Sequence, residues 1–129
     1  YSVDYISSFD FLSTNDSRLS YGEKKIKHYL IRNNLNFKQQ FQFIDCINKK
    51  PLLFDFYISD KNILIEFDGK QHFEPTEYFG GIDGFNYRKK NDMIKNNYCI
   101  ENKIELIRIS YEDINVVDKI LDKYLCICL

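Results

Sequence analysis

The segment NILIEFDGKQH, residues 62–72, constrains the fold of this chain more than any other. It begins with the continuous apolar run that is typical of a buried strand. Residues two apart in a strand share a face, so Glu66 and Asp68 point to the same side, together with Leu64. The sequence therefore predicts a buried strand that carries two carboxylates at the end where Gly69 follows.

A third carboxylate belongs to the preceding strand. Asp55 lies between two phenylalanines, and a hairpin through residues 59–61 brings it beside Glu66. Two like charges about 4 Å apart repel by about 4 kcal/mol at an effective dielectric constant of about 20, which is a large share of a domain's total stability. Such a cluster needs a cation or a proton. Oxygen ligands favour Mg²⁺ or Mn²⁺, which usually complete their shells with water and substrate phosphate, so the cluster indicates phosphodiester chemistry.

Composition limits the function classes. The 129 residues suit one domain, and eighteen basic residues are offset by nineteen acidic ones, so a nucleic-acid site must be a local patch. The four cysteines lack the paired spacing of a zinc site and the density of a disulfide scaffold. No apolar stretch approaches the ~20 residues of a membrane span. We therefore expect a soluble, reduced protein without a membrane partner, located inside the cell where DNA is accessible, either in the cytoplasm or in the nucleus.

The pattern along the chain predicts one α/β domain. Residues 1–19 show no period and are interpreted as an irregular arm or a linker from an upstream region, with the domain over 20–129. Ser20 and Glu23 have the form of a capping box at the start of a helix. The expected elements are a helix over 20–34, strands over 37–44, 52–58 and 62–68, a loop over 70–86, a helix over 87–101, a strand over 104–109 and a closing helix from 114 to 125.

Charges on the helix expected over 87–101 provide the local patch. Arg88, Lys89, Lys90 and Lys95 are candidates for contacts with a phosphate backbone, because neutralised phosphates supply most nonspecific affinity. Asp92 shares a helical face with Arg88 and Lys95, which fits either a solvated row of ion pairs or an edge that faces phosphate.

Several of these residues also have structural interpretations. Glu23 is explained by the capping box alone, Asp68 before Gly69 by the start of a turn, and His72 by a solvated loop. The aromatic residues of the 70–86 loop either stack on bases or cover the sheet; they are Phe73, Tyr78, Phe79 and Phe85.

A set of short motifs resembles a known superfamily. The motifs are Gly22-Glu23, FDF at 54–56, IEFDGKQH at 65–72, DMIK at 92–95 and IELIRIS at 104–110. Together they resemble the PD-(D/E)xK nucleases, and within them the very-short-patch repair endonucleases and related homing endonucleases with an E, D, H, D signature. The resemblance covers about residues 20–112. It implies a restriction-endonuclease-like αβββαβ core with a four-stranded mixed sheet flanked by helices, and Mg²⁺-dependent hydrolysis of double-stranded DNA, with Mn²⁺ as a substitute.

The resemblance also implies roles for individual residues. It assigns functional roles to Glu23, Asp55, Glu66, His72 and Asp92. Together with the reasoning from the residues, the expected catalytic set also includes Lys95, the expected metal ligands are Asp55, Glu66 and Asp68, and the expected DNA contacts are Lys70, Arg88, Lys89 and Lys90. One position departs from the superfamily pattern, because Asp68 stands where a lysine is usual. His72, Lys70 and Lys95 are the candidates to replace that lysine. The departure also supports an alternative, a nuclease-like module that has lost catalysis and serves in DNA binding or assembly.

Overall fold

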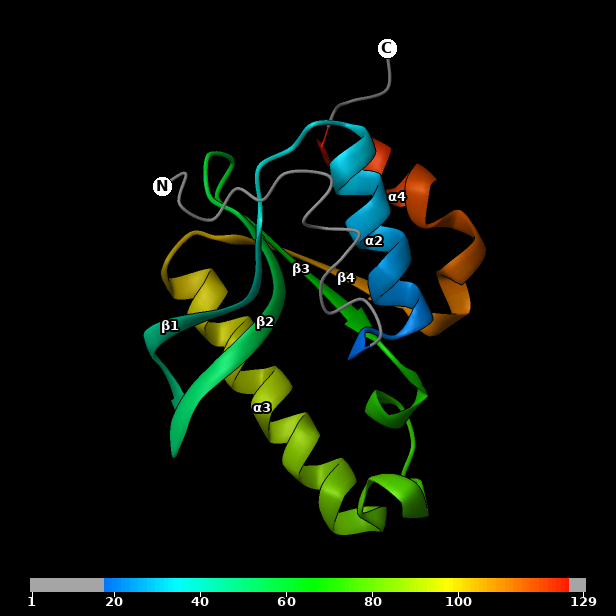
Figure 1. Ribbon diagram of the computed structural model, residues 1–129. Helices are drawn as coiled ribbons and strands as arrows, with labels where there is room; N and C mark the ends of the chain where they lie inside the picture. Colours follow the sequence, from blue (N-terminus) through cyan, green and yellow to red (C-terminus); the bar gives the residue numbers. More distant parts are fainter. Residues whose placement is uncertain (1–17, 126–129) are drawn as a thin grey trace.

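The computed structural model describes residues 18–125 as an α/β fold with one four-stranded sheet (Figure 1). Most of the predicted N-terminal arm, together with Cys126 and Cys128, lies outside the described residues. The helices and strands are α2 (Tyr21–Arg32), β1 (Lys38–Asn48), β2 (Lys50–Ile58), β3 (Ile63–Asp68), α3 (Gly81–Glu101), β4 (Glu105–Ser110) and α4 (Val117–Leu125), and three short 3₁₀ helices are η3 (Lys70–His72), η4 (Glu77–Phe79) and η5 (Tyr111–Val116).

The predicted αβββαβ order and the mixed sheet are confirmed. The strands lie in the order β1-β2-β3-β4. The first three form an antiparallel meander, and β4 returns through α3 to pair parallel with β3. Because β3 has a neighbour on each side and helices over both faces, its apolar sequence is buried on both faces. β1 is longer than predicted, and its register with β2 shifts between Gln42 and Ile47.

Helices cover both faces of the sheet. One core cluster joins α2 and α4 to β2, β3 and β4, and it includes Ile26, Ile65 and Leu121. The other joins α3 to the opposite face around Leu64 and Cys99. Among residues 18–125, none of the helices combines the length and the apolar character that a membrane span requires.

α3 begins six residues earlier than predicted, inside the segment expected to be a loop. The helix starts after Gly80, which has a φ of 90°. This left-handed conformation is one that glycine adopts without steric strain. Arg88 ties this part of the helix to the preceding segment by donating hydrogen bonds to the carbonyl oxygens of Gln71 (3.1 Å) and Phe79 (2.8 Å). Cys99, near the end of α3, is the one buried residue of this helix. The first turns bury no side chain, so no apolar period in the sequence marks where the helix begins.

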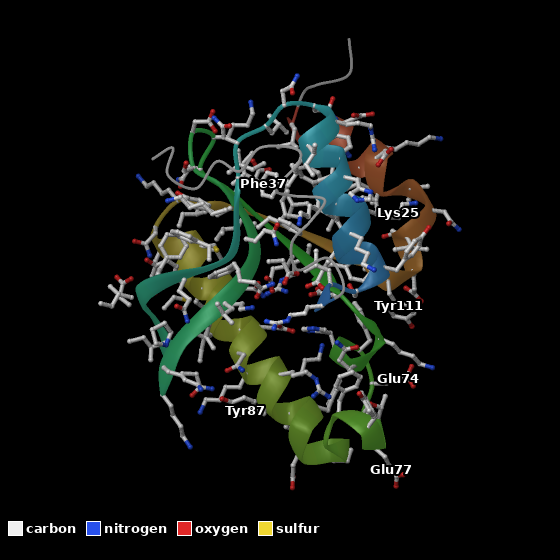
Figure 2. The ribbon with its side chains drawn as sticks, in the orientation of Figure 1. Lys25, Phe37, Glu74, Glu77, Tyr87 and Tyr111 are labelled. Carbon is white, nitrogen blue, oxygen red and sulfur yellow. The ribbon has the colours of Figure 1, made fainter. Side chains whose placement is uncertain are left out.

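The larger apolar side chains of α3 are covered to different extents. Ile94 and Tyr98 pack against the core, but Tyr87 is 50% exposed. Tyr87 lies in the first half of α3, on a part of the helix that projects away from the centre of the sheet (Figures 1 and 2).

Gly22 allows α2 to approach the end of β3. A β-carbon at this position would lie 2.3 Å from ring atoms of Phe67, which is inside van der Waals contact. The close approach brings the first turn of α2, including Glu23, to the edge of the sheet where the carboxylates of β2 and β3 emerge. Gly22 is therefore required for packing at the position where the site is assembled.

Gly22→Ala is expected to lower the free energy of unfolding by about 1–3 kcal/mol, because the added methyl group must displace the Phe67 ring. Urea denaturation of the variant and the wild type measures this loss. The double variant Gly22→Ala/Phe67→Leu supplies the control, since the smaller side chain makes room for the methyl group. If Phe67→Leu lowers the free energy of unfolding as much in the Gly22→Ala variant as in the wild type, the contact between residues 22 and 67 does not limit stability.

Candidate active site

The two predicted strand carboxylates face each other where β2 and β3 separate. Regular pairing between these strands reaches Phe56 and Ile65, and the next positions are Asp55 and Glu66. At these positions, hydrogen bonds from backbone N–H groups to side-chain carboxylates replace the backbone hydrogen bonds between the strands. The Asp55 N–H donates to Glu66 Oε2 at 2.7 Å, and the Phe67 N–H donates to Asp55 Oδ2 at 2.8 Å. These reciprocal bonds fix both carboxylates at one end of the sheet, as the sequence predicts.

Strand β1, the other neighbour of Asp55 in the sheet, is also irregular. Gln40 of β1 lies between the pairs formed by Gln39 and Phe41 with β2, and its φ of 49° is unusual for a residue with a β-carbon. Phe54 and Phe56 share a nominal strand face, yet they pack in the core clusters on opposite sides of the sheet. Local distortions of this kind concentrate at functional sites.

A pocket of about 350 Å³ opens at this point. Five of the six predicted catalytic residues line it, each from a different element: Glu23 (α2), Asp55 (β2), Glu66 (β3), His72 (η3) and Lys95 (α3). The remaining lining residues are Ser20, Phe67, Gly69, Gln71 and Phe79. Acidic, basic and imidazole groups from distant parts of the sequence therefore meet around one cavity.

Asp55 is the most perturbed acid of the site. Burial raises its pKa to about 9, with further increases from the negative charges of Glu66 and Glu23 and an opposing effect of the Phe67 N–H bond. At neutral pH this carboxyl group must hold a proton or lie beside a cation. A donor set of this chemistry suits a hard divalent ion, which would neutralise the repulsion among the three carboxylates.

Glu23 has both of the roles that the sequence left open. Its carboxylate accepts a hydrogen bond from the Ser20 N–H at 2.8 Å, and its own N–H donates to Ser20 Oγ at 3.2 Å, which completes the predicted capping box. The same side chain lines the pocket and contributes to the raised pKa of Asp55. The cap therefore holds a carboxylate at the pocket wall.

Lys95 places its ammonium group beside the acid pair. Its Nζ donates to Glu66 Oε1 at 2.8 Å and sits 5.0 Å from the centre of the Phe54 ring. The alternative candidate, Lys70, is exposed and does not line the pocket. Helix α3, which packs on the sheet beside Leu64, therefore brings an ammonium group to the acid pair.

His72 and Asp92 form a hydrogen-bonded pair beside the pocket. His72 Nδ1 lies 3.2 Å from Asp92 Oδ2. Burial alone would raise the pKa of Asp92, but the hydrogen bond with His72 and the charge of Arg108 hold that pKa below its ordinary value. Asp92 does not line the pocket, so it acts on the site through the imidazole that it orients.

Arg108 is the site residue that sequence reasoning missed. It pairs with Glu66 in the parallel register of β3 and β4, and its Nη1 lies 3.2 Å from Asp68 Oδ1. Its Nη2 donates to the carbonyl oxygen of Asp92 at 3.4 Å. A single arginine in the apolar run LIRI, residues 106–109, was the available signal, since a charge on a strand that a helix covers requires a partner.

Asp68 differs from the other predicted metal ligands. It is buried at the end of β3, and both of its oxygens lie within 3.4 Å of Arg108 Nη1. It does not line the pocket with Asp55 and Glu66. Asp68 is therefore positioned to form an ion pair with Arg108 and not to line the pocket.

The basic residues proposed for DNA contacts divide into two groups. Lys70, Lys89 and Lys90 are exposed at the end of the molecule that carries η3 and the first half of α3 (Figure 1). Arg88 instead uses its guanidinium to hold the preceding segment, as described above, so its first role is structural.

Within residues 18–125, no three histidine, cysteine or acidic side chains form a complete metal site. Two carboxylates with substrate phosphate and water are nevertheless the usual shell of Mg²⁺. No family model matches the chain, and no curated protein or solved structure compared with it gives a match. A function must therefore be inferred from the chemistry of the site itself.

Proposed function

We propose that this chain is a divalent-metal-dependent endonuclease that hydrolyses phosphodiester bonds of double-stranded DNA, of the homing or repair type. The observation that carries the proposal is the meeting of three mutually repelling carboxylates with Lys95 and His72 in one pocket. A purely structural cluster would neutralise its charges in ion pairs. Here the pKa of Asp55 stays raised despite the lysine on Glu66.

Asp55 and Glu66 would hold Mg²⁺, with Mn²⁺ as a substitute, and Glu23 lies close enough to influence both. When bound, the ion supplies positive charge for the phosphate and lowers the pKa of a water molecule. The reciprocal bonds between the two strands orient the acids before any ion arrives. The chain therefore needs little rearrangement to bind the ion.

His72 and Lys95 are placed for proton transfer and charge stabilisation. Asp92 holds His72 Nδ1, which leaves Nε2 to exchange a proton in the pocket. An imidazole has an ordinary pKa near ~6.5 and can act as acid or base at neutral pH. Lys95 Nζ donates to Glu66 Oε1 at 2.8 Å and would offer its ammonium group to a bound phosphate.

DNA is the substrate that the surrounding surface fits best. The exposed lysines 70, 89 and 90 offer cations to a phosphate backbone near the pocket, although the chain as a whole has a formal charge of −1. A polyanion approaching this end places a phosphate near the acid pair. RNA shares this backbone chemistry and is compared in the same assay.

The test is cleavage of supercoiled plasmid DNA by the wild type with Mg²⁺, with EDTA, and with RNA as a parallel substrate. Glu66→Gln is expected to lower the rate by about 10³-fold, since loss of several kcal/mol of metal-assisted stabilisation has this effect. Glu105→Gln, at an exposed acid of β4, is the matched control and should cleave normally. A folded wild type that binds DNA but never cleaves it with Mg²⁺ or Mn²⁺ would instead support the inactive module.

A further inference from the structure

Arg108 Nη1 lies at the centre of three carboxylates that come from two different elements. It is 3.2 Å from Asp68 Oδ1, 3.7 Å from Asp92 Oδ1 and 3.9 Å from Glu66 Oε1. Asp68 and Glu66 belong to β3, and Asp92 belongs to α3. Carboxylates that converge on one point from separate elements form the kind of position that a hard cation occupies.

The guanidinium is held firmly in this position. Its Nε donates to Asn96 Oδ1 at 3.1 Å, and Nη2 donates to the Asp92 carbonyl oxygen at 3.4 Å. Its side chain is 22% exposed, and a guanidinium stays protonated at all relevant pH values. The positive charge at this point is therefore permanent.

The cations are unevenly distributed over the acidic cluster. Asp68 and Asp92 pair with Arg108, whereas Glu66 lies between the two cations, 2.8 Å from Lys95 Nζ and 3.9 Å from Arg108 Nη1. Within residues 18–125, no lysine or arginine forms an ion pair with Asp55 or Glu23. The protein's own cations thus lie against Asp68, Asp92 and Glu66, whereas Asp55 must hold a proton or lie beside an ion from solution.

We propose that Arg108 occupies the place of a second cation, so that the site binds one divalent ion at Asp55 and Glu66 and excludes a second ion from the Asp68, Asp92 and Glu66 side. This inference rests on the proposed function. It makes Arg108 a positioning residue, which acts on the site through the carboxylates that it pairs with.

Counting bound ions tests the inference without relying on activity. Calorimetric titration with Mn²⁺ in the absence of DNA should give one ion for the wild type and two ions for Arg108→Gln, whose three carboxylates lose their cation. Arg108→Lys keeps a positive charge and should bind one ion. Arg32→Gln is the matched control, because Arg32 forms an ion pair with Asp118 at 2.8 Å far from the pocket, and it should also bind one ion.

Folding is checked by thermal melting with and without saturating Mn²⁺. If Arg108→Gln is unstable alone, Mn²⁺ should raise its melting temperature more than that of Arg32→Gln, since a ligand stabilises the state that binds it. A folded Arg108→Gln that binds one ion or none overturns the role of Arg108. A wild type that binds no Mn²⁺ contradicts the proposed function itself, so the two failures are distinguishable.

Discussion

Asp55→Asn is expected to abolish cleavage of DNA and, in the absence of metal, to make the protein more stable than the wild type at neutral pH. Burial and the charges of Glu66 and Glu23 raise the pKa of Asp55 to about 9. The amide has no charge to bury, and its carbonyl oxygen can still accept the Phe67 N–H bond that Asp55 accepts. The variant therefore loses the proposed metal ligand without losing the geometry of the strands.

The sign of the pH dependence follows from proton linkage. The ordinary pKa of an aspartate side chain is 3.8, and that of Asp55 in the folded protein is about 9, so the folded state holds this proton more tightly than the unfolded state. The stability that the proton provides is complete below about pH 4. It is lost as the pH rises toward about 9, by up to ~1.4 kcal/mol per pH unit. The advantage of Asp55→Asn should therefore be absent near pH 4 and reach a few kcal/mol near pH 8.

Chemical denaturation in EDTA at several pH values measures this difference, with Asp60→Asn in the exposed turn after β2 as the control. Adding Mg²⁺ at pH 8 should stabilise the wild type and leave Asp55→Asn unchanged, because only the wild type has the complete acid pair. Parallel pH profiles for the two proteins, or equal stabilisation by Mg²⁺, would contradict a shared cation at Asp55 and Glu66.

His72→Ala is expected to reduce the cleavage rate by about 10²–10⁴-fold, the usual contribution of a general acid or base. The imidazole lines the pocket and is oriented by Asp92 at 3.2 Å. The chain offers a matched control in its other histidine, His28, which is exposed on α2. His28→Ala should cleave at the wild-type rate.

Single-turnover cleavage with Mg²⁺ in excess measures both variants. Imidazole added to the buffer should restore part of the activity of His72→Ala, because the truncated side chain leaves room for it beside Asp92. Rates that differ less than threefold between the two alanine variants would remove His72 from the reaction and leave Lys95 as the candidate for proton transfer.

The acid pair and the order of helices and strands along the chain were predictable because both depend on short-range rules. Asp55 and Glu66 belong to strands joined by a tight hairpin, so the period of two and the turn length determine which side chains meet. Ser20 and Glu23 form a local capping box that is visible in the sequence. These features required no knowledge of how distant segments pack.

Arg108, the pairing of Asp68 and the start of α3 depend on long-range geometry. The register of the parallel pair places Arg108 opposite Glu66, and nothing in either strand alone determines that register. The position of Lys95 depends on the packing of a helix on which Cys99 alone is fully buried. From the sequence, Lys70, His72 and Lys95 were equal candidates for the role of the expected lysine. The packing of α3 on β3 favours Lys95, because it brings Nζ to Glu66.

The hydrogen bonds exchanged between Asp55 and β3 also limit how this chain can evolve. Each acid accepts a backbone N–H from the neighbouring strand, so replacement of either acid by alanine would leave a backbone donor without its partner and open the sheet. Asparagine and glutamine keep an acceptor. A descendant that abandoned its chemistry would therefore be expected to drift toward amides at these two positions, and such amides would mark former enzymes among similar sequences.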